Sequence, residues 1–165
     1  MITSKSNPVF GGVYKLVAVE KNGKIIPKIK ISDNIEKITN PHFKHIYRLY
    51  DKNNKIIADM LAIHDEKLDE NQLVLVEPNK EWVKKAITEY KIKDIRKLII
   101  ENGKVIYKFP TVNQTRKQVQ DELNTVWEEA KRLENPHTYI VNLSKNLRKM
   151  KEDLLNSHSE KDNSL

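Results

Sequence analysis

The chain has 165 residues, which is long enough for one domain with a hydrophobic core. Lys and Arg number 30 and Asp and Glu 23, so the net charge is +7, and the chain contains no cysteine. Disulfides, thiolate chemistry and cysteine-based zinc sites are therefore excluded for this chain. The acidic residues are interleaved with the basic ones, a pattern more typical of a solvated surface than of a nucleic-acid interface.

Apolar runs stay well short of the roughly 20 residues that a membrane span needs. Residues 1–8 are polar and do not resemble the apolar segment of a signal peptide. We therefore expect a cytoplasmic protein with neither a membrane nor a nucleic acid as its partner.

The first part of the chain is predicted to form a β-hairpin. An apolar segment over 12–20 is followed by Asn22-Gly23 and then by a return segment over 25–31. Asn-Gly between apolar runs is a strong hairpin signal. Pro27 lies in the return segment and favours an edge strand, because proline cannot donate a backbone hydrogen bond.

Further strands are expected up to residue 109. The segments 45–50 and 56–63 predict a second hairpin, and 73–76 predicts a short strand that ends at Pro78-Asn79. Residues 82–90 are ambiguous, and we favour a strand. A third hairpin is predicted over 98–101 and 105–107, with Asn102-Gly103 at its turn.

The hydrophobic period changes to that of helices after Pro110. Thr111 and Gln114 fit a capping box at the start of a helix. This helix is expected to bury one face and to stop at Asn135-Pro136, and residues 139–141 are expected to form an extended link. Ser144 is a plausible N-cap of a second helix that frays from residue 156. The apolar positions of the first helix are Val119, Leu123, Val126, Trp127, Ala130 and Leu133.

These elements predict an α+β fold, with an antiparallel sheet of hairpins followed by two C-terminal helices. Strands that precede helices, rather than alternating with them, argue against a complete α/β barrel or a Rossmann unit. The predicted organisation is an antiparallel β region over 1–109, a two-helix region over 110–157 and a disordered tail over 158–165.

The chain offers few candidates for catalysis or metal binding. His42 and His45 are three residues apart, but a third ligand of a suitable type is not evident. The run His64 to Glu66 holds three polar groups that alternate between faces of an extended chain and so do not converge. Trp82 and Trp127 are expected to be core anchors. We therefore predict neither a catalytic residue nor a metal ligand in this chain.

Several short motifs, in order along the chain, resemble the late part of bacterial nicotinate phosphoribosyltransferases. They begin with Ile2 to Lys5 and Gly11 to Val19. The stretch from Lys30 to Pro41 is similar to the family's pattern K-x-S-E-N-x-E-K-x-T-x-P. The remaining motifs are Tyr47 to Asp51, Ala58 to Met60, His64 to Glu66, Trp82 to Lys85, Asn102 to Lys104, Trp127 with Arg132-Leu133, Asn135 to His137, and Leu143-Ser144 with Leu147.

The resemblance implies a C-terminal fragment of such an enzyme, a type II phosphoribosyltransferase whose α/β barrel is absent here. The family joins nicotinate to phosphoribosyl pyrophosphate, with coupled ATP hydrolysis, to give nicotinate mononucleotide for NAD salvage. The catalytic residues would lie upstream of this chain, which would be inactive alone and bind no cofactor by itself; the full enzyme would use ATP and Mg. The implied partners are the missing N-terminal and barrel portion and a second subunit in a homodimer.

The resemblance also implies that Thr3, Ser4 and Lys5 lie near the phosphate-binding loop and contact phosphate or its surroundings. One residue departs from the family, which carries Gly after the Pro of its T-N-P-G turn, whereas this chain has His42. If the turn needs a positive φ, His42 costs about 1 kcal/mol.

A stand-alone basic module that binds RNA or another anionic partner is the alternative function. A fragment severed from a barrel exposes the apolar surface that met the barrel, so we predict that the isolated chain self-associates or binds a hydrophobic dye. Light scattering and dye fluorescence test this. A monodisperse monomer without dye binding, retained on a polyanion with a steep salt dependence, would favour the binding module.

Overall fold

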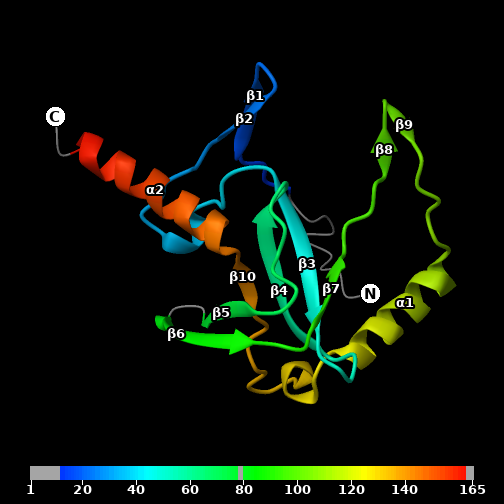
Figure 1. Ribbon diagram of the computed structural model, residues 1–165. Helices are drawn as coiled ribbons and strands as arrows, with labels where there is room; N and C mark the ends of the chain where they lie inside the picture. The colour runs from blue at the N-terminus through cyan, green and yellow to red at the C-terminus, as the bar shows by residue number, and fades with distance from the viewer. Residues whose placement is uncertain (1–11, 78–79, 163–165) are drawn as a thin grey trace, which may run out of the picture. The chain divides into compact units, whose positions relative to one another are not determined.

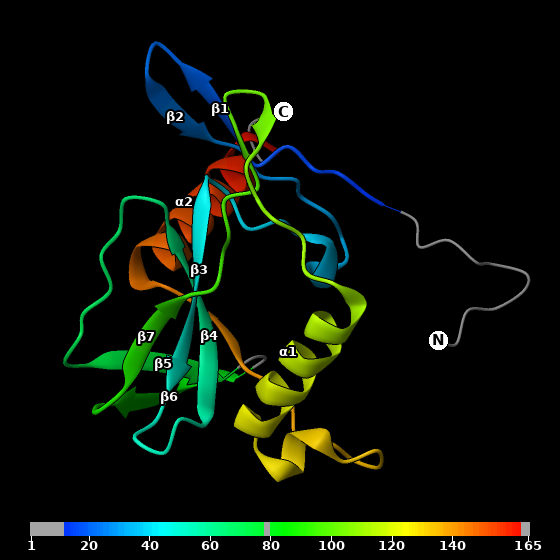
Figure 2. The same cartoon turned by 90° about the vertical axis from the view of Figure 1, so that its right-hand side faces the viewer.

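The computed structural model describes residues 12–77 and 80–162 (Figure 1, and Figure 2 for the view turned by 90°). The described chain forms two compact units. One unit spans Lys44–Lys149, and the other combines the residues up to Phe43 with those from Met150 onward. This division differs from the predicted boundary at 109/110, because the strand β10 after that boundary pairs with a strand before it.

The larger unit is built on a four-stranded sheet in the order β10-β4-β3-β7. β3 (Lys44–Tyr50) and β4 (Ile56–Ile63) form the predicted second hairpin, and β7 (Lys91–Asp94) pairs antiparallel with β3. β10 (Val141–Leu143) pairs parallel with β4. The extended link predicted over 139–141 is therefore partly a strand, which the sequence pattern did not reveal.

The hydrophobic core lies on one face of this sheet. Leu49 of β3 is opposite Ala58 of β4, and both side chains are fully buried. Successive residues of a strand point to opposite faces, so Met60 shares this face with Ala58. Leu75 and Ile87 complete the buried cluster from β5 (Leu73–Glu77) and β6 (Lys80–Ile87), which pair as an antiparallel hairpin.

The two predicted Asn-Gly hairpins are confirmed, although their strands are short. Asn102 and Gly103 join β8 (Ile100–Glu101) to β9 (Lys104–Val105), with φ values of 48° and 75°. Positive φ at both central residues is the geometry that favours Asn-Gly. In the smaller unit, Asn22 and Gly23 join β1 (Ala18–Lys21) to β2 (Lys24–Pro27), again with positive φ at both residues. A 3-10 turn in the same unit covers Ile35–Lys37.

The first helix begins as predicted but ends early. In α1 (Val112–Thr125), Thr111 and Gln114 form the capping box, with Thr111 N donating to Gln114 Oε1 at 2.8 Å. Val126 is already extended, and a 3-10 turn covers Glu128–Lys131. The prediction of one continuous helix with a buried face through Leu133 was wrong. None of the residues of α1 is buried, and Leu133 is fully exposed.

The second helix, α2 (Lys145–Asp162), follows Ser144 and extends further than expected. Residues 158–162, placed in the predicted disordered tail, belong to this helix, while 163–165 lie outside the described residues. The predicted fold class is nevertheless confirmed. The described chain is α+β, with small sheets that are antiparallel except for the β10–β4 pair and with two C-terminal helices, and it contains no closed barrel.

His42 adopts a positive φ, as expected from the glycine that the family carries at this position of its T-N-P-G turn. Its φ is 73°, in the left-handed region, and its side chain is 8% exposed. The amide of His42 donates to the carbonyl oxygen of Val17 at 2.7 Å, so the turn is tied to the segment before β1. A β-carbon at such a φ is strained, which is why glycine suits this position.

We predict that His42→Gly is more stable than His42→Ala by about 0.5–1 kcal/mol. Both variants lose the imidazole ring, so their difference isolates the backbone strain. The same pair at Glu20, an exposed strand residue without a positive φ, should show the opposite order. Chemical denaturation of the four variants tests this, and an alanine at 42 as stable as glycine would contradict it.

Candidate functional site

A charged pair lies on the face of the sheet opposite the core. Arg48 of β3 and Asp59 of β4 are directly opposite one another in the register. Arg48 Nε donates to Asp59 Oδ1 at 2.8 Å, and its Nη2 donates to Oδ2 at 3.0 Å. The side chain of Asp59 is 7% exposed and that of Arg48 is 19% exposed. A two-point guanidinium–carboxylate pair of this kind is strong and directional.

Tyr139, from the segment after α1, lies close to this pair and carries a stacked tryptophan. The rings of Trp127 and Tyr139 stack with centroids 5.5 Å apart and an interplanar angle of 11°. Burial, and then the negative charge of Asp59, raises the pKa of Tyr139. The hydrogen bond to Asp59 raises the pKa of Arg48 above its already high value. Tyr139 therefore stays protonated and Arg48 stays charged at any physiological pH, so neither group is poised for proton transfer.

The end of α1 reaches the same part of the unit through polar contacts. Arg48 Nη1 lies 3.9 Å from Glu122 Oε2. Lys55, in the turn between β3 and β4, donates from Nζ to the carbonyl oxygen of Asn124 at 2.6 Å. Because cations favour the carbonyl end of a helix, Lys55 both satisfies a terminal carbonyl and complements the helix dipole.

A second polar cluster fixes the start of α2. Ser144 Oγ donates to Glu66 Oε2 at 2.5 Å and accepts from the amide of Leu147 at 3.2 Å, as expected of an N-cap. The amide of Ser144 donates to the carbonyl oxygen of Leu61 at 2.7 Å, which extends the β10–β4 pairing to the helix. Nearby in sequence, Asn142 accepts from the amide of Val76 at 2.7 Å, so β10 is tied to the β5–β6 hairpin.

The residues singled out from the sequence have other surroundings. Thr3, Ser4 and Lys5 lie outside the described residues, so their contact with phosphate stays a prediction. His45 Nδ1 is 3.0 Å from the hydroxyl of Tyr47, and burial followed by the charge of Arg96 lowers the pKa of His45. Among the described residues, no group of three His, Cys, Asp or Glu side chains could hold a metal ion. We therefore assign no side chain here to Mg or ATP.

The prediction that both tryptophans are core anchors was half wrong. Trp127 is partly buried in its stack with Tyr139, but Trp82 on β6 is 78% exposed.

The sequence motifs contained Arg48, Asp59 and Glu66 but did not reveal their partners. The Arg48–Asp59 pair depends on the register between β3 and β4, and Glu66 meets Ser144 across 78 positions of sequence. The alternation of β3 and β4 across a five-residue turn was the one signal that could have paired Arg48 with Asp59.

These geometries describe a structural domain whose polar groups hold elements together. A family profile described as "Nicotinate phosphoribosyltransferase C-terminal domain" matches residues 43–151. The chain belongs to this family. The described part of the protein contains no helix that is both long and apolar enough to cross a membrane.

Relatives from bacteria and animals share this C-terminal domain. The nicotinate phosphoribosyltransferase of Bacillus subtilis (strain 168) is 39% identical over 146 residues, which are 87% of this chain and 30% of the relative. That of Caenorhabditis elegans is 32% identical over 150 residues, 89% of this chain and 26% of the relative. A crystal structure of human nicotinic acid phosphoribosyltransferase matches the fold with a TM-score of 0.64 at 24% identity, covering 71% of this chain and 24% of that chain. The chain thus spans less than a third of the length of each.

We predict that Asp59→Ala destabilises the protein by about 3–5 kcal/mol, because it removes the two-point partner of a largely buried Arg48 and leaves only the 3.9 Å contact to Glu122. The double replacement Arg48→Leu with Asp59→Leu should cost less than the single one. Asp94→Ala is the matched control, since Asp94 pairs with Arg96 at 2.7 Å but is 38% exposed, and exposed pairs contribute about 0–1 kcal/mol. Urea denaturation measures all three, and equal costs for Asp59→Ala and Asp94→Ala would contradict the prediction.

Proposed function

We propose that this chain serves as the C-terminal domain of a nicotinate phosphoribosyltransferase and does not catalyse the reaction by itself. The family match over residues 43–151 carries this proposal. The reaction of the whole enzyme would join nicotinate to phosphoribosyl pyrophosphate with coupled ATP hydrolysis, as the resemblance of the sequence motifs implies. ATP and Mg would bind to the rest of the enzyme, which would be a cytoplasmic homodimer.

The contacts of the polar side chains support a structural role. Arg48 donates to Asp59 through Nε and Nη2, and Glu66 accepts from the Ser144 hydroxyl at the start of α2. Each group is engaged in holding two elements of the unit together. Because these charged groups are engaged within the unit, the domain would contribute stability and positioning to the enzyme rather than a reacting atom.

The alternative of an RNA-binding module gains no support from a specific contact. Several basic side chains are already paired with carboxylates, namely Arg48 with Asp59, Arg96 with Asp94, Lys131 with Glu128 and Arg132 with Glu129. Paired charges at a surface reduce the field available to a polyanion. We therefore keep the enzyme domain as the function that the structure supports best.

The purified chain should form no nicotinate mononucleotide from nicotinate, phosphoribosyl pyrophosphate, ATP and Mg, because it would lack the reacting groups. The same assay should detect activity in a joined enzyme, made by replacing the 146 matching residues of the bacterial relative with this chain. The relative truncated before that region is the control and should lose most of its activity. Product formation by the chain alone, or a folded but inactive joined enzyme, would contradict the proposal.

A further inference from the structure

α1 presents two opposite faces to different surroundings. At about 100° per residue, Val112, Val119 and Leu123 lie within roughly 40° of one another on one side of the helix. The other side faces a groove of about 690 Å³ that α1 forms with the sheet and the β3–β4 turn of the same unit. That groove is lined from α1 by Gln114, Lys117, Gln118, Asp121, Glu122 and Thr125, and from the strands and turn by Tyr50, Asn54, Lys91 and Lys93. The helix therefore turns its polar face toward its own unit.

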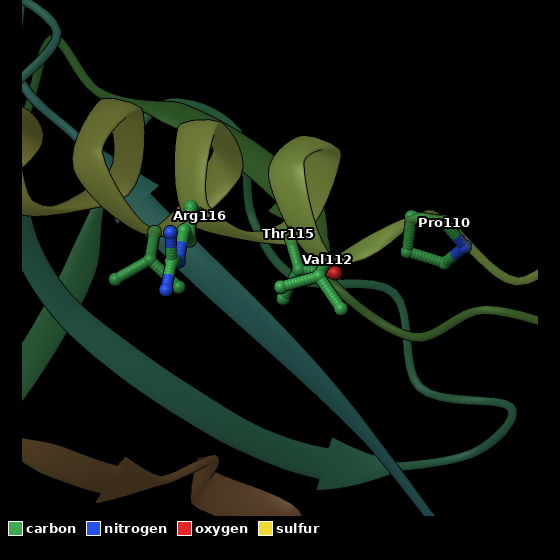
Figure 3. A pocket seen from close by; sticks show the side chains of 5 residues that line it. Pro110, Val112, Thr115 and Arg116 are labelled. Atoms are coloured by element: carbon green, nitrogen blue, oxygen red, sulfur yellow. The ribbon is translucent and has the colours of Figure 1, made fainter. Parts of the chain in front are cut away.

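The apolar face of α1, defined here as Val112, Val119 and Leu123, is correspondingly exposed. The exposed fractions of these side chains are 71%, 52% and 44%. Next to the first two lies a shallow hollow of about 350 Å³, which Pro110, Thr115 and Arg116 also line (Figure 3). An amphipathic helix in a folded protein normally buries its apolar stripe. Among the described residues, this face therefore lacks the cover that its sequence pattern predicts.

The segment that leads into α1 exposes apolar side chains as well. The β8–β9 hairpin extends from the unit as a separate two-stranded ribbon, seen in green on the right of Figure 1. A two-stranded hairpin alone is only marginally stable in water. The exposed large side chains of this segment are Leu98, Ile100, Val105, Ile106 and Phe109, each more than half exposed. Residues 98–123 thus form a continuous stretch of chain whose apolar groups find little cover within the unit.

The charges of this stretch favour a partner other than a second copy. Within residues 98–123, Lys117, Asp121 and Glu122 line the groove on the opposite side of α1. The remaining charged residues are the basic Lys104, Lys108 and Arg116 and the acidic Glu101. A twofold interface would place the same patch on both sides, so like charges would meet. The surface instead suits an apolar partner with an acidic rim.

The lengths of the relatives indicate where such a partner is found. The domain occurs in the bacterial and nematode enzymes within chains of which it makes up 30% and 26%, and in the human structure within a chain of which it covers 24%. We propose that the apolar face of α1 docks against the part of a nicotinate phosphoribosyltransferase subunit that precedes the C-terminal domain. This inference rests on the proposed function and adds the surface through which the domain acts.

Amide hydrogen exchange tests the docking. We compare the segment 109–126 in this chain alone and in the joined enzyme, where exchange should slow by at least about tenfold, since docking raises the cost of local opening. The triple variant Val112→Gln, Val119→Gln, Leu123→Gln should lose that gain within the joined enzyme. Glutamine is at least as good a helix former as valine, so α1 should still form. The matched control, Lys117→Gln with Asp121→Gln on the opposite face, should keep the protection.

The outcomes separate the docking surface from the function. An active joined enzyme in which 109–126 exchanges as fast as in the isolated chain overturns the docking surface and leaves the proposed function standing. A triple variant as protected as the control overturns it too. A folded, inactive joined enzyme overturns both. Protection of 109–126 in the isolated chain that rises with concentration, with no further gain in the joined enzyme, would assign this face to a second copy and also overturn the proposal.

Discussion

The Arg48–Asp59 pair links the parts of the larger unit. It bridges β3 and β4 on the face opposite the core, and its remaining guanidinium nitrogen lies within 3.9 Å of Glu122 on α1. The Trp127–Tyr139 stack lies beside it and leads into β10. A buried ion pair is a poor source of net stability compared with apolar packing, but it is intolerant of a missing partner. Its role is therefore to fix register and to hold the α1-to-β10 segment in one arrangement.

Local signals predicted the elements that depend on local chemistry. The Asn-Gly turns, the capping box of Thr111 and the N-cap at Ser144 follow from backbone geometry and short-range hydrogen bonds, and each is present in the structure. The family motifs identified the domain for the same reason, since they are contiguous in sequence. Each of these features can therefore be predicted without knowing which distant segments of the chain come into contact.

The errors lie where tertiary contacts override a local pattern. The apolar period from Val119 to Leu133 predicted a single helix, but Trp127 leaves that stripe to stack on Tyr139, and the helix ends at Thr125. β10 was not foreseen because a three-residue strand has too few positions to show a period, and its parallel pairing with β4 joins residues about 80 positions apart. The polar clusters of Arg48 with Asp59 and of Glu66 with Ser144 likewise become visible only once register and topology are known.

The weak attachment of α1 has a consequence for the lifetime of the protein. A helix of 14 residues without a buried side chain draws little stability from packing, and an isolated helix of that length is marginal in water. The hairpin before it is similarly unsupported. Opening of this region therefore takes far less free energy than unfolding the sheet, and a protease would reach residues 98–126 from an otherwise native chain. Contact of the apolar face of α1 with the preceding part of a subunit would shield this region, so the rate of cleavage within 98–126 would report how much of the time that face is covered.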